Sequence, residues 1–201
     1  HLQAAGHSTS VYNRTSSRAV DWRNAHGGSM AATPALAAAG ADVVMLCVGD
    51  DDDVRSVVYG DDGVLAGMDS GGILVDHTTA SAELARELGR STSEMGIGFI
   101  DGPVSGGEAG AQGGQLSVMC GGDPEVFNRA KPIIDSYAKA VILVGPVGHG
   151  QLTKMVNQIL ISANIQGLAE GIVMGRESGL DMEKVLDLLG QGSAQSWWLD
   201  N

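Results

Sequence analysis

The chain has 201 residues, of which 43% are hydrophobic, with 30 glycines and five prolines, which is enough for one sizeable core and a second small unit. Its net charge of −12, from 12 basic and 24 acidic residues, argues against nucleic acid and anionic membranes as partners, because both are bound through clustered cations. No apolar run reaches the ~18 residues of a membrane helix and no signal peptide opens the chain, so we expect a cytoplasmic protein.

Short apolar runs alternate with helical patterns along the first 147 residues. Continuous runs of Val, Ile, Leu and Met are typical of strands in a parallel sheet that is covered on both faces. We expect six such strands, at residues 11–12, 42–48, 73–75, 99–100, 116–119 and 141–144. Thr33-Pro34, Ser81 and Asp123-Pro124 mark helix starts between them. This alternation predicts an α/β fold with a Rossmann-type doubly wound parallel sheet.

The pattern changes near Gly148. From Gln151 to Glu177 there is no proline, and apolar residues recur at helical spacing, which predicts one helix of roughly 26 residues, too long for a sheet-covering crossover. Asp181 then opens a further helix that ends at Gly190. We therefore expect a Rossmann domain at residues 1–147 and the start of an all-helical domain at residues 148–201.

Both ends of the chain indicate a fragment. A Rossmann unit opens with a strand and a glycine-rich turn, and neither precedes the strand at residues 11–12. Apolar Trp197-Trp198-Leu199 stand at the other end with nothing after them to cover them. Exposed apolar helices there favour a homodimer or homotetramer.

The first candidate site follows the strand at residues 11–12, where a Rossmann fold places the adenosine ribose. An acidic residue at this point accepts a hydrogen bond from the ribose 2′-hydroxyl and selects NAD, whereas an arginine accommodates the 2′-phosphate of NADP. Here Asn13, Arg14 and Thr15 stand at this point, and a guanidinium can bind phosphate through two hydrogen bonds. The site favours NADP, with NAD possible; an ordinary turn with a solvated arginine is the alternative.

Further cofactor contacts are expected at two more strand ends, because ligands of open parallel sheets bind beyond the carboxyl ends of the strands. Val48 and Gly49 follow one strand and Thr79 follows the next. Thr79 suits a helix cap equally well. Four consecutive aspartates, residues 50–53, indicate an acidic helix start rather than a metal site, so no metal is expected. Cys47 and Cys120 lie in apolar runs and are expected to be buried, reduced thiols.

A substrate site is suggested by a glycine turn and a long helix. Ser105, Gly106 and Gly107 can form an anion-binding nest for a carboxylate, although a turn that merely needs left-handed backbone angles has the same composition. Lys154 and Asn157 are three residues apart on the predicted helix and share a face. A lysine at an apolar domain junction titrates nearer neutrality, as a general acid/base requires; the alternative is a surface lysine.

Four segments together resemble the β-hydroxyacid dehydrogenase family, which includes 3-hydroxyisobutyrate dehydrogenases and tartronate semialdehyde reductases. They are Val-Tyr-Asn-Arg-Thr at 11–15, Asp-His-Thr-Thr-Ala-Ser at 76–81, Asp-Gly-Pro-Val-Ser-Gly-Gly at 101–107 and Gly-Gln-Leu-Thr-Lys-Met-Val-Asn-Gln at 150–158. The resemblance implies hydride transfer between NADP(H) or NAD(H) and a small β-hydroxyacid or semialdehyde acid. A small carboxylate-bearing substrate is implied with it.

The resemblance also implies roles for the matched residues. Lys154 resembles the family's catalytic acid/base, and Asn157 resembles a residue that orients the substrate. Ser105, Gly106 and Gly107 correspond to the substrate-carboxylate site, and Asn13, Arg14, Val48, Gly49 and Thr79 correspond to cofactor contacts. A non-catalytic NADP-binding or oligomerisation module of the same fold is the alternative, as is an imine reductase relative. Both alternatives expect the lysine to be replaced.

Overall fold

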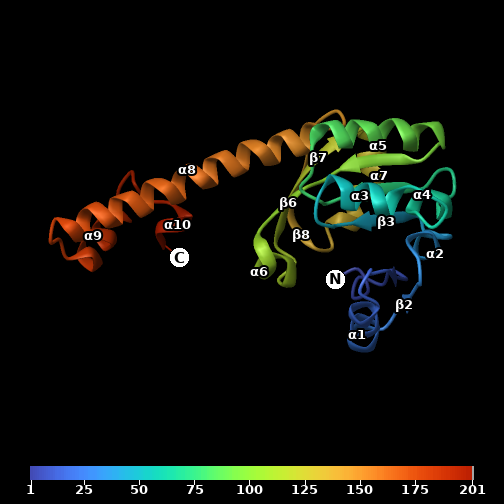
Figure 1. The fold of residues 1–201 in the computed structure, drawn as a ribbon, viewed down its shortest axis with the longest axis horizontal. Helices are drawn as coiled ribbons and strands as arrows, with labels where there is room; N and C mark the ends of the chain where they lie inside the picture. The colour runs from blue at the N-terminus through green and yellow to red at the C-terminus, as the bar shows by residue number, and fades with distance from the viewer. Residues whose placement is uncertain (201) are drawn as a thin grey trace. The chain divides into compact units, whose positions relative to one another are not determined.

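The computed structural model describes residues 1–200. The chain divides into two compact units, which meet in sequence between Lys154 and Met155. The first unit contains every strand of the described chain (Figure 1). The boundary expected near residue 147 stays a prediction.

The main sheet of the first unit has six strands in the order β3-β4-β5-β7-β6, with β8 also paired to β7. These strands are β3 (Val43–Leu46), β4 (Ile73–Asp76), β5 (Gly98–Asp101), β6 (Val104–Ser105), β7 (Leu116–Gly122) and β8 (Ala138–Gly145). The expected parallel pairing is confirmed for β3, β4 and β5, and β7 is parallel to β8. In contrast, β7 runs antiparallel to β5 and β6, because the chain reverses direction between β6 and β7, in the segment that contains residues 107–112.

Three of the helices described in the first unit begin at the capping residues that the sequence indicates. The helices of this unit are α1 (Ser16–His26), α2 (Pro34–Ala38), α3 (Asp51–Val58), α4 (Val64–Gly67), α5 (Ala82–Glu94), α6 (Gly107–Gln112) and α7 (Pro124–Ile134). The side chains of Thr33, Ser81 and Asp123 each accept a hydrogen bond from a backbone N–H in the first turn of α2, α5 and α7. Three predicted helix starts are thereby confirmed.

Two hydrophobic cores lie on opposite faces of the main sheet. Alternate side chains of a strand point to opposite faces, and Leu74 of β4 belongs to one core while its neighbours Ile73 and Val75 belong to the other. The first core is completed by α2, α3, α4 and α5, and the second by α7 (Figure 1). Covering both faces explains why these strands are apolar runs without alternation.

A second, two-stranded parallel sheet pairs β1 (Ser10–Val11) with β2 (Ser29–Met30). Among the described residues β1 pairs only with β2, and β3 only with β4. A hollow of about 1900 Å³ is lined by residues of both β1 and β3. In the Rossmann strand order the first strand lies between the second and the fourth, and this hollow corresponds to that place. The single sheet expected from the sequence is therefore two sheets with a gap between them.

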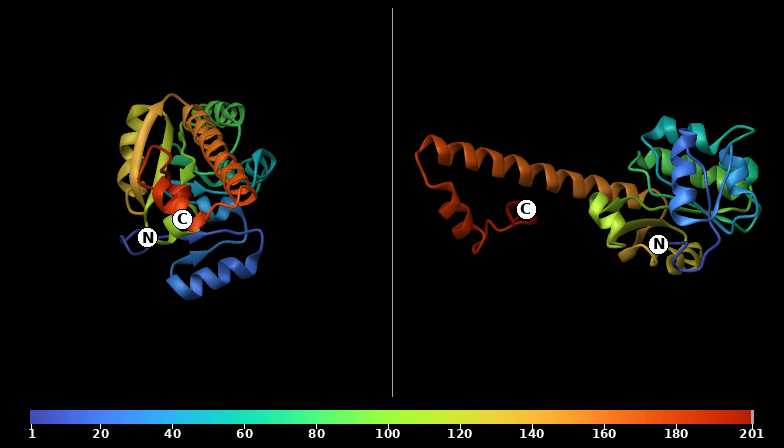
Figure 2. Two further views of the ribbon diagram at one scale, coloured as in Figure 1. Left: turned by 90° about the vertical axis from the view of Figure 1, so that its left-hand side faces the viewer. Right: turned by 90° about the horizontal axis from the view of Figure 1, so that it is seen from below.

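The second unit is helical. Helix α8 (His149–Glu177) is one continuous helix of 29 residues that begins in the first unit, and α9 (Met182–Leu189) and α10 (Trp197–Asp200) follow it (Figure 2). Gly179 ends α8 with a φ of +73°, and Asp181 and Gly190 flank α9, as expected. Among residues 1–200, no helix combines the length and apolarity needed to cross a bilayer.

Candidate active site

The candidate site is built at the carboxyl ends of β3, β4 and β5. Leu46, Asp76 and Asp101 are in register across these three parallel strands. The loops that follow them therefore leave the sheet at one edge, which is where ligands of open α/β sheets bind.

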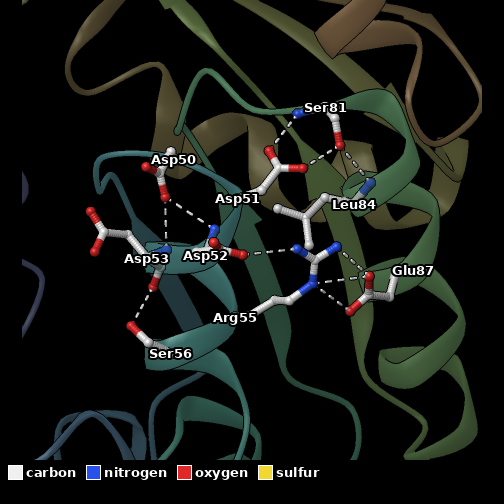
Figure 3. Close-up of polar contacts among 9 residues, drawn as sticks. All are labelled: Asp50, Asp51, Asp52, Asp53, Arg55, Ser56, Ser81, Leu84 and Glu87. Carbon is white, nitrogen blue, oxygen red and sulfur yellow. Dashed lines mark hydrogen bonds and ion pairs between the residues drawn. The ribbon is translucent and has the colours of Figure 1, made fainter.

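Hydrogen bonds tie the loops after β3 and β4 together. The backbone N–H of Val48 donates to the hydroxyl of Thr78 at 3.0 Å. Ser81, the N-cap of α5, donates its backbone N–H and its hydroxyl to the carboxylate of Asp51 in the first turn of α3 (Figure 3). The two helix starts that flank the site are thus fixed to each other.

The aspartates of residues 50–53 form a helix start, as predicted. Asp50 is the N-cap of α3 and accepts the N–H groups of Asp52 and Asp53 at 3.0 Å each (Figure 3). Asp52 pairs with Arg55, which also binds Glu87 of α5. Within residues 1–200, no group of three or more potential ligand side chains is arranged to hold a metal ion.

A buried carboxylate fixes the start of the long helix at the same edge. Asp101 accepts the backbone N–H of Gly148 at 2.7 Å through one oxygen and that of Gln151 at 2.9 Å through the other. Such a carboxylate is favourable at a helix N-terminus, where N–H groups lack partners within the helix. Burial nevertheless raises the pKa of Asp101 to about 6, against the lowering effect of these hydrogen bonds.

The side chain of Gln151 makes a second connection between α8 and the sheet edge. It is only 1% exposed, donates to the carbonyl of Thr78 at 2.7 Å and accepts the N–H of Ala80 at 3.0 Å. The loop after β4 is therefore held by the first turn of α8. Sequence reasoning assigned no role to Gln151 or Asp101, although a carboxylate that ends an apolar strand signals a buried polar partner.

Lys154 follows Gln151 by three residues and is buried, with 9% of its surface exposed. Its Nζ donates to the carbonyl oxygen of Val104 at 2.9 Å, and none of the ion pairs among the described residues includes it. Burial without a carboxylate partner disfavours the ammonium form and lowers the pKa of Lys154. The alternative of a solvated surface lysine is wrong.

The glycine turn predicted for the substrate begins beside the carbonyl that Lys154 contacts. Ser105 follows Val104 in β6 and is half-buried, and Gly106 and Gly107 are exposed. Both glycines have positive φ, +136° and +62°, so the turn does require left-handed backbone angles. Asn157 belongs to the second unit, is half-buried and donates to the side chain of Gln158. The roles of all four residues stay predictions.

The predicted cofactor residues meet at one hollow, with one exception. The 1900 Å³ hollow is lined by Asn13, Arg14, Thr15, Val48 and Gly49. Thr79 is exposed and is not among its lining residues, and the cap of α5 is Ser81 rather than Thr79. The contact of Thr79 with a cofactor stays a prediction.

The lining of this hollow suits a phosphorylated dinucleotide. The side chain of Arg14 is 79% exposed and offers a cation at the rim, while Asn13 accepts the N–H of Thr15 and so shapes the turn that presents it. Cys47, which also lines the hollow, is exposed rather than buried, because it lies in the loop beyond β3.

His77 is a buried side chain beside the candidate site. One ring nitrogen makes a hydrogen bond with the carbonyl oxygen of Gly102, and the other makes one with the hydroxyl of Tyr137. Burial lowers the pKa of His77, which favours the neutral ring. Asp76, just before it, has its pKa raised to about 6 by burial.

Comparison with known proteins agrees with this arrangement. Residues 1–145 match the NAD binding domain of 6-phosphogluconate dehydrogenase, and residues 148–201 match a family described as NAD-binding of NADP-dependent 3-hydroxyisobutyrate dehydrogenase. An uncharacterized oxidoreductase of Shewanella frigidimarina is 52% identical over the whole chain, which covers 69% of that relative. A mitochondrial 3-hydroxyisobutyrate dehydrogenase-like protein of Arabidopsis thaliana is 40% identical over 98% of the chain, which covers 65% of it.

Solved structures give the same result. The 3-hydroxyisobutyrate dehydrogenase of Mycobacterium tuberculosis with L-serine matches 98% of this chain and 66% of its own, with a TM-score of 0.89 and 30% identity. Psf3 in complex with NADP+ and 2-OPP matches 99% of this chain and 70% of its own, with the same score and identity. The resemblance read from the sequence is confirmed: the chain belongs to the β-hydroxyacid dehydrogenase family, whose members are NAD(P)-dependent oxidoreductases.

Proposed function

We propose that the chain carries the cofactor site and the proton-transferring lysine of an NADP-dependent dehydrogenase for a small β-hydroxyacid, which reduces the corresponding semialdehyde acid in the reverse direction. The proposal depends on one observation: Lys154 is a buried amine without a carboxylate partner at the sheet edge. The relatives named 3-hydroxyisobutyrate dehydrogenase support the substrate class, as does L-serine, itself a β-hydroxyacid, in one solved structure. We also propose a cytoplasmic homo-oligomer.

Lys154 supplies the proton chemistry of this proposal. The bound nicotinamide provides or accepts the hydride. In the direction of reduction the ammonium of Lys154 gives a proton to the substrate carbonyl oxygen, and in oxidation the neutral amine takes the proton of the hydroxyl. Its lowered pKa makes the ammonium a better proton donor and the neutral amine more abundant at a given pH. Ser105, Gly106 and Gly107 hold the substrate carboxylate, and Asn157 orients its hydroxyl.

Asn13, Arg14, Thr15, Val48, Gly49 and Thr79 are proposed to hold the cofactor. Arg14 carries the preference for NADP, because a guanidinium binds a phosphate through paired hydrogen bonds. The complex of Psf3 with NADP+ supports this choice.

The test is turnover by the purified full-length protein with NADPH or NADH and a panel of tartronate, methylmalonate and succinate semialdehydes and glyoxylate. We expect faster oxidation of NADPH, and a loss of about 10²–10⁴-fold in kcat for Lys154→Ala. In the direction of reduction, kcat should fall as the pH rises through the pKa of Lys154, because only the ammonium can donate. Lys154→Arg keeps the charge but releases no proton near neutrality, and should be nearly as slow as Lys154→Ala.

Lys184→Ala is the matched control, since this lysine of α9 is 83% exposed; it should turn over like the wild type. Near-normal activity of Lys154→Ala would remove the lysine from the mechanism. Binding of NADP+ without turnover of any substrate in the panel would favour the non-catalytic module instead.

A further inference from the structure

The side chain of Asp53 does not take part in the hydrogen bonds and ion pairs that the other aspartates at the start of α3 make. In α3, Asp50 caps the helix, Asp51 binds Ser81, and Asp52 pairs with Arg55. Figure 3 shows the Asp53 carboxylate pointing away from the side chains of Arg55 and Glu87. Its partner lies in the loop after β1: Oδ1 accepts a hydrogen bond from Nη1 of Arg14 at 3.0 Å.

The same carboxylate also lies against the second loop expected to hold the cofactor. Its Oδ2 fills the space where a Cβ on Gly49 would stand. One side chain therefore contacts both the arginine after β1 and the glycine loop after β3. Asp53, Arg14 and Gly49 all line the one hollow.

Asp53 thus offers Arg14 the anion that a ribose 2′-phosphate would offer. Carboxylate and phosphate both bind a guanidinium through its N–H groups, so the two compete for Arg14. The pair is accessible, with 79% of the Arg14 side chain and 31% of the Asp53 side chain exposed, and such a pair is easily exchanged. A displaced Asp53 carboxylate would still stand near the phosphate and repel it. A ribose with a free 2′-hydroxyl leaves the pair intact.

We propose that Asp53 is a specificity-determining residue of the cofactor site: its carboxylate binds Arg14 as an internal competitor and holds the preference for 2′-phosphorylated over unphosphorylated dinucleotides below what Arg14 alone would give. The proposal rests on the assignment of Arg14 to the phosphate in the proposed function. According to the proposal, Arg14 and Asp53 together determine the ratio of NADP to NAD affinity.

The test measures the Kd of NADP+ and of NAD+ by calorimetry at one low ionic strength. The proteins compared are the wild type, the single variants Asp53→Asn, Asp52→Asn and Arg14→Ala, and the double variant Arg14→Ala/Asp53→Asn. Asp52→Asn is the matched control, because it removes the same charge one residue away in the same turn. We expect Asp53→Asn to tighten NADP+ binding by about twofold to fivefold and to leave NAD+ binding unchanged. Asp52→Asn should change NADP+ binding by less than about 1.5-fold, and the gain from Asp53→Asn should vanish in the Arg14→Ala background.

Adenosine 2′-monophosphate, followed by NMR titration, repeats the series with a probe that has no pyrophosphate. A gain from Asp53→Asn equal to that from Asp52→Asn, or one that persists without Arg14, would show general charge repulsion and overturn the proposal. If Arg14→Ala leaves the NADP+ to NAD+ ratio unchanged, the phosphate assignment in the proposed function fails first. Absence of binding of both probes to every variant overturns both. Asp53→Glu keeps the carboxylate and should bind NADP+ no more tightly than the wild type.

Discussion

The carboxylate of Asp101 ends strand β5 and accepts the backbone N–H groups of Gly148 and Gln151 at the start of α8. Burial disfavours its charge more than these bonds favour it, so its pKa is raised to about 6. Asp76 lies opposite Asp101 on β4, and burial raises the pKa of Asp76 to about 6 as well. Two carboxylates at the site edge therefore change protonation in the mildly acidic range.

This raised pKa predicts how stability depends on pH. The native state holds the proton of Asp101 up to about pH 6, whereas an unfolded aspartate loses it near 3.9. The stability that this group contributes is therefore complete below about pH 4 and is lost as the pH rises through about 6. Asp101→Asn should remove part of this decline, so between pH 4 and 7.5 the free energy of unfolding should fall less in the variant, by roughly 1–3 kcal/mol.

The measurement is urea unfolding at several pH values. Asp123→Asn is the control, because Asp123 also accepts two backbone N–H groups at a helix start but is exposed. Curves for wild type and Asp101→Asn that run parallel across the pH range would contradict the assignment. The Asn variant should also be less stable at every pH, because its amide –NH₂ group replaces an acceptor and faces a backbone N–H.

Local motifs in the sequence single out candidate residues such as Lys154, but they do not show which residues bind partners far away in the chain. Lys154 could be singled out from its apolar helix. Gln151 could not, because its partners Thr78 and Ala80 lie more than 70 positions earlier. Asp53 was read correctly as part of a helix start, but its pairing with Arg14 needs the loops of two sheets to converge, which no local pattern encodes.

At the scale of elements, β3, β4, β5, β7 and β8 of the main sheet could be predicted because each contains a run of apolar residues. Strands β2 (Ser29–Met30) and β6 (Val104–Ser105) were missed, since two residues are too few to show a period. The antiparallel pairing of β7 also could not be read, because continuous apolar runs do not encode direction. The separation of β1–β2 from the main sheet also could not be predicted, because it depends on which distant strands pair. The apolar run at residues 42–48 does not show which strand lies beside it.

Unequal pairing predicts unequal protection of the strands. The residues of β4 are all buried, and β4 has β3 and β5 as parallel partners, whereas the two residues of β1 are partly exposed and pair only with β2. Amide hydrogen exchange should therefore be slower in β4 than in β1 by a factor of roughly 100 or more. Hydrogen-exchange mass spectrometry measures this, with β8, paired only to β7 among the described residues, as an intermediate reference. Equal protection of β1 and β4 would contradict the division into two sheets.

For the whole molecule, the sequence predicted an α/β part followed by helices, because the change from short apolar runs to one long helical period is visible near residue 148. The second unit exposes many large apolar side chains: Val156, Ile159, Leu160, Val173, Met174, Leu188 and Trp197. A subunit partner would cover apolar side chains of this kind. The expected homodimer or homotetramer accords with them and stays a prediction.

The net charge of −12 gives a prediction for the molecule as a whole. A large excess of one charge destabilises the compact state through self-repulsion, and salt screens that repulsion, with a Debye length of about 10 Å at 0.1 M. Raising NaCl from about 0.02 to 0.3 M should therefore stabilise the protein by roughly 0.5–1 kcal/mol and raise Tm by about 1–4 °C. Scanning calorimetry measures the shift, and sucrose at equal osmolality controls for general exclusion of solute. Salt also weakens the ion pairs Arg14–Asp53 and Lys184–Asp181, but pairs of this kind contribute little to stability. A Tm that falls with NaCl would therefore contradict the prediction and mean that specific pairs, rather than net repulsion, dominate the electrostatic stability.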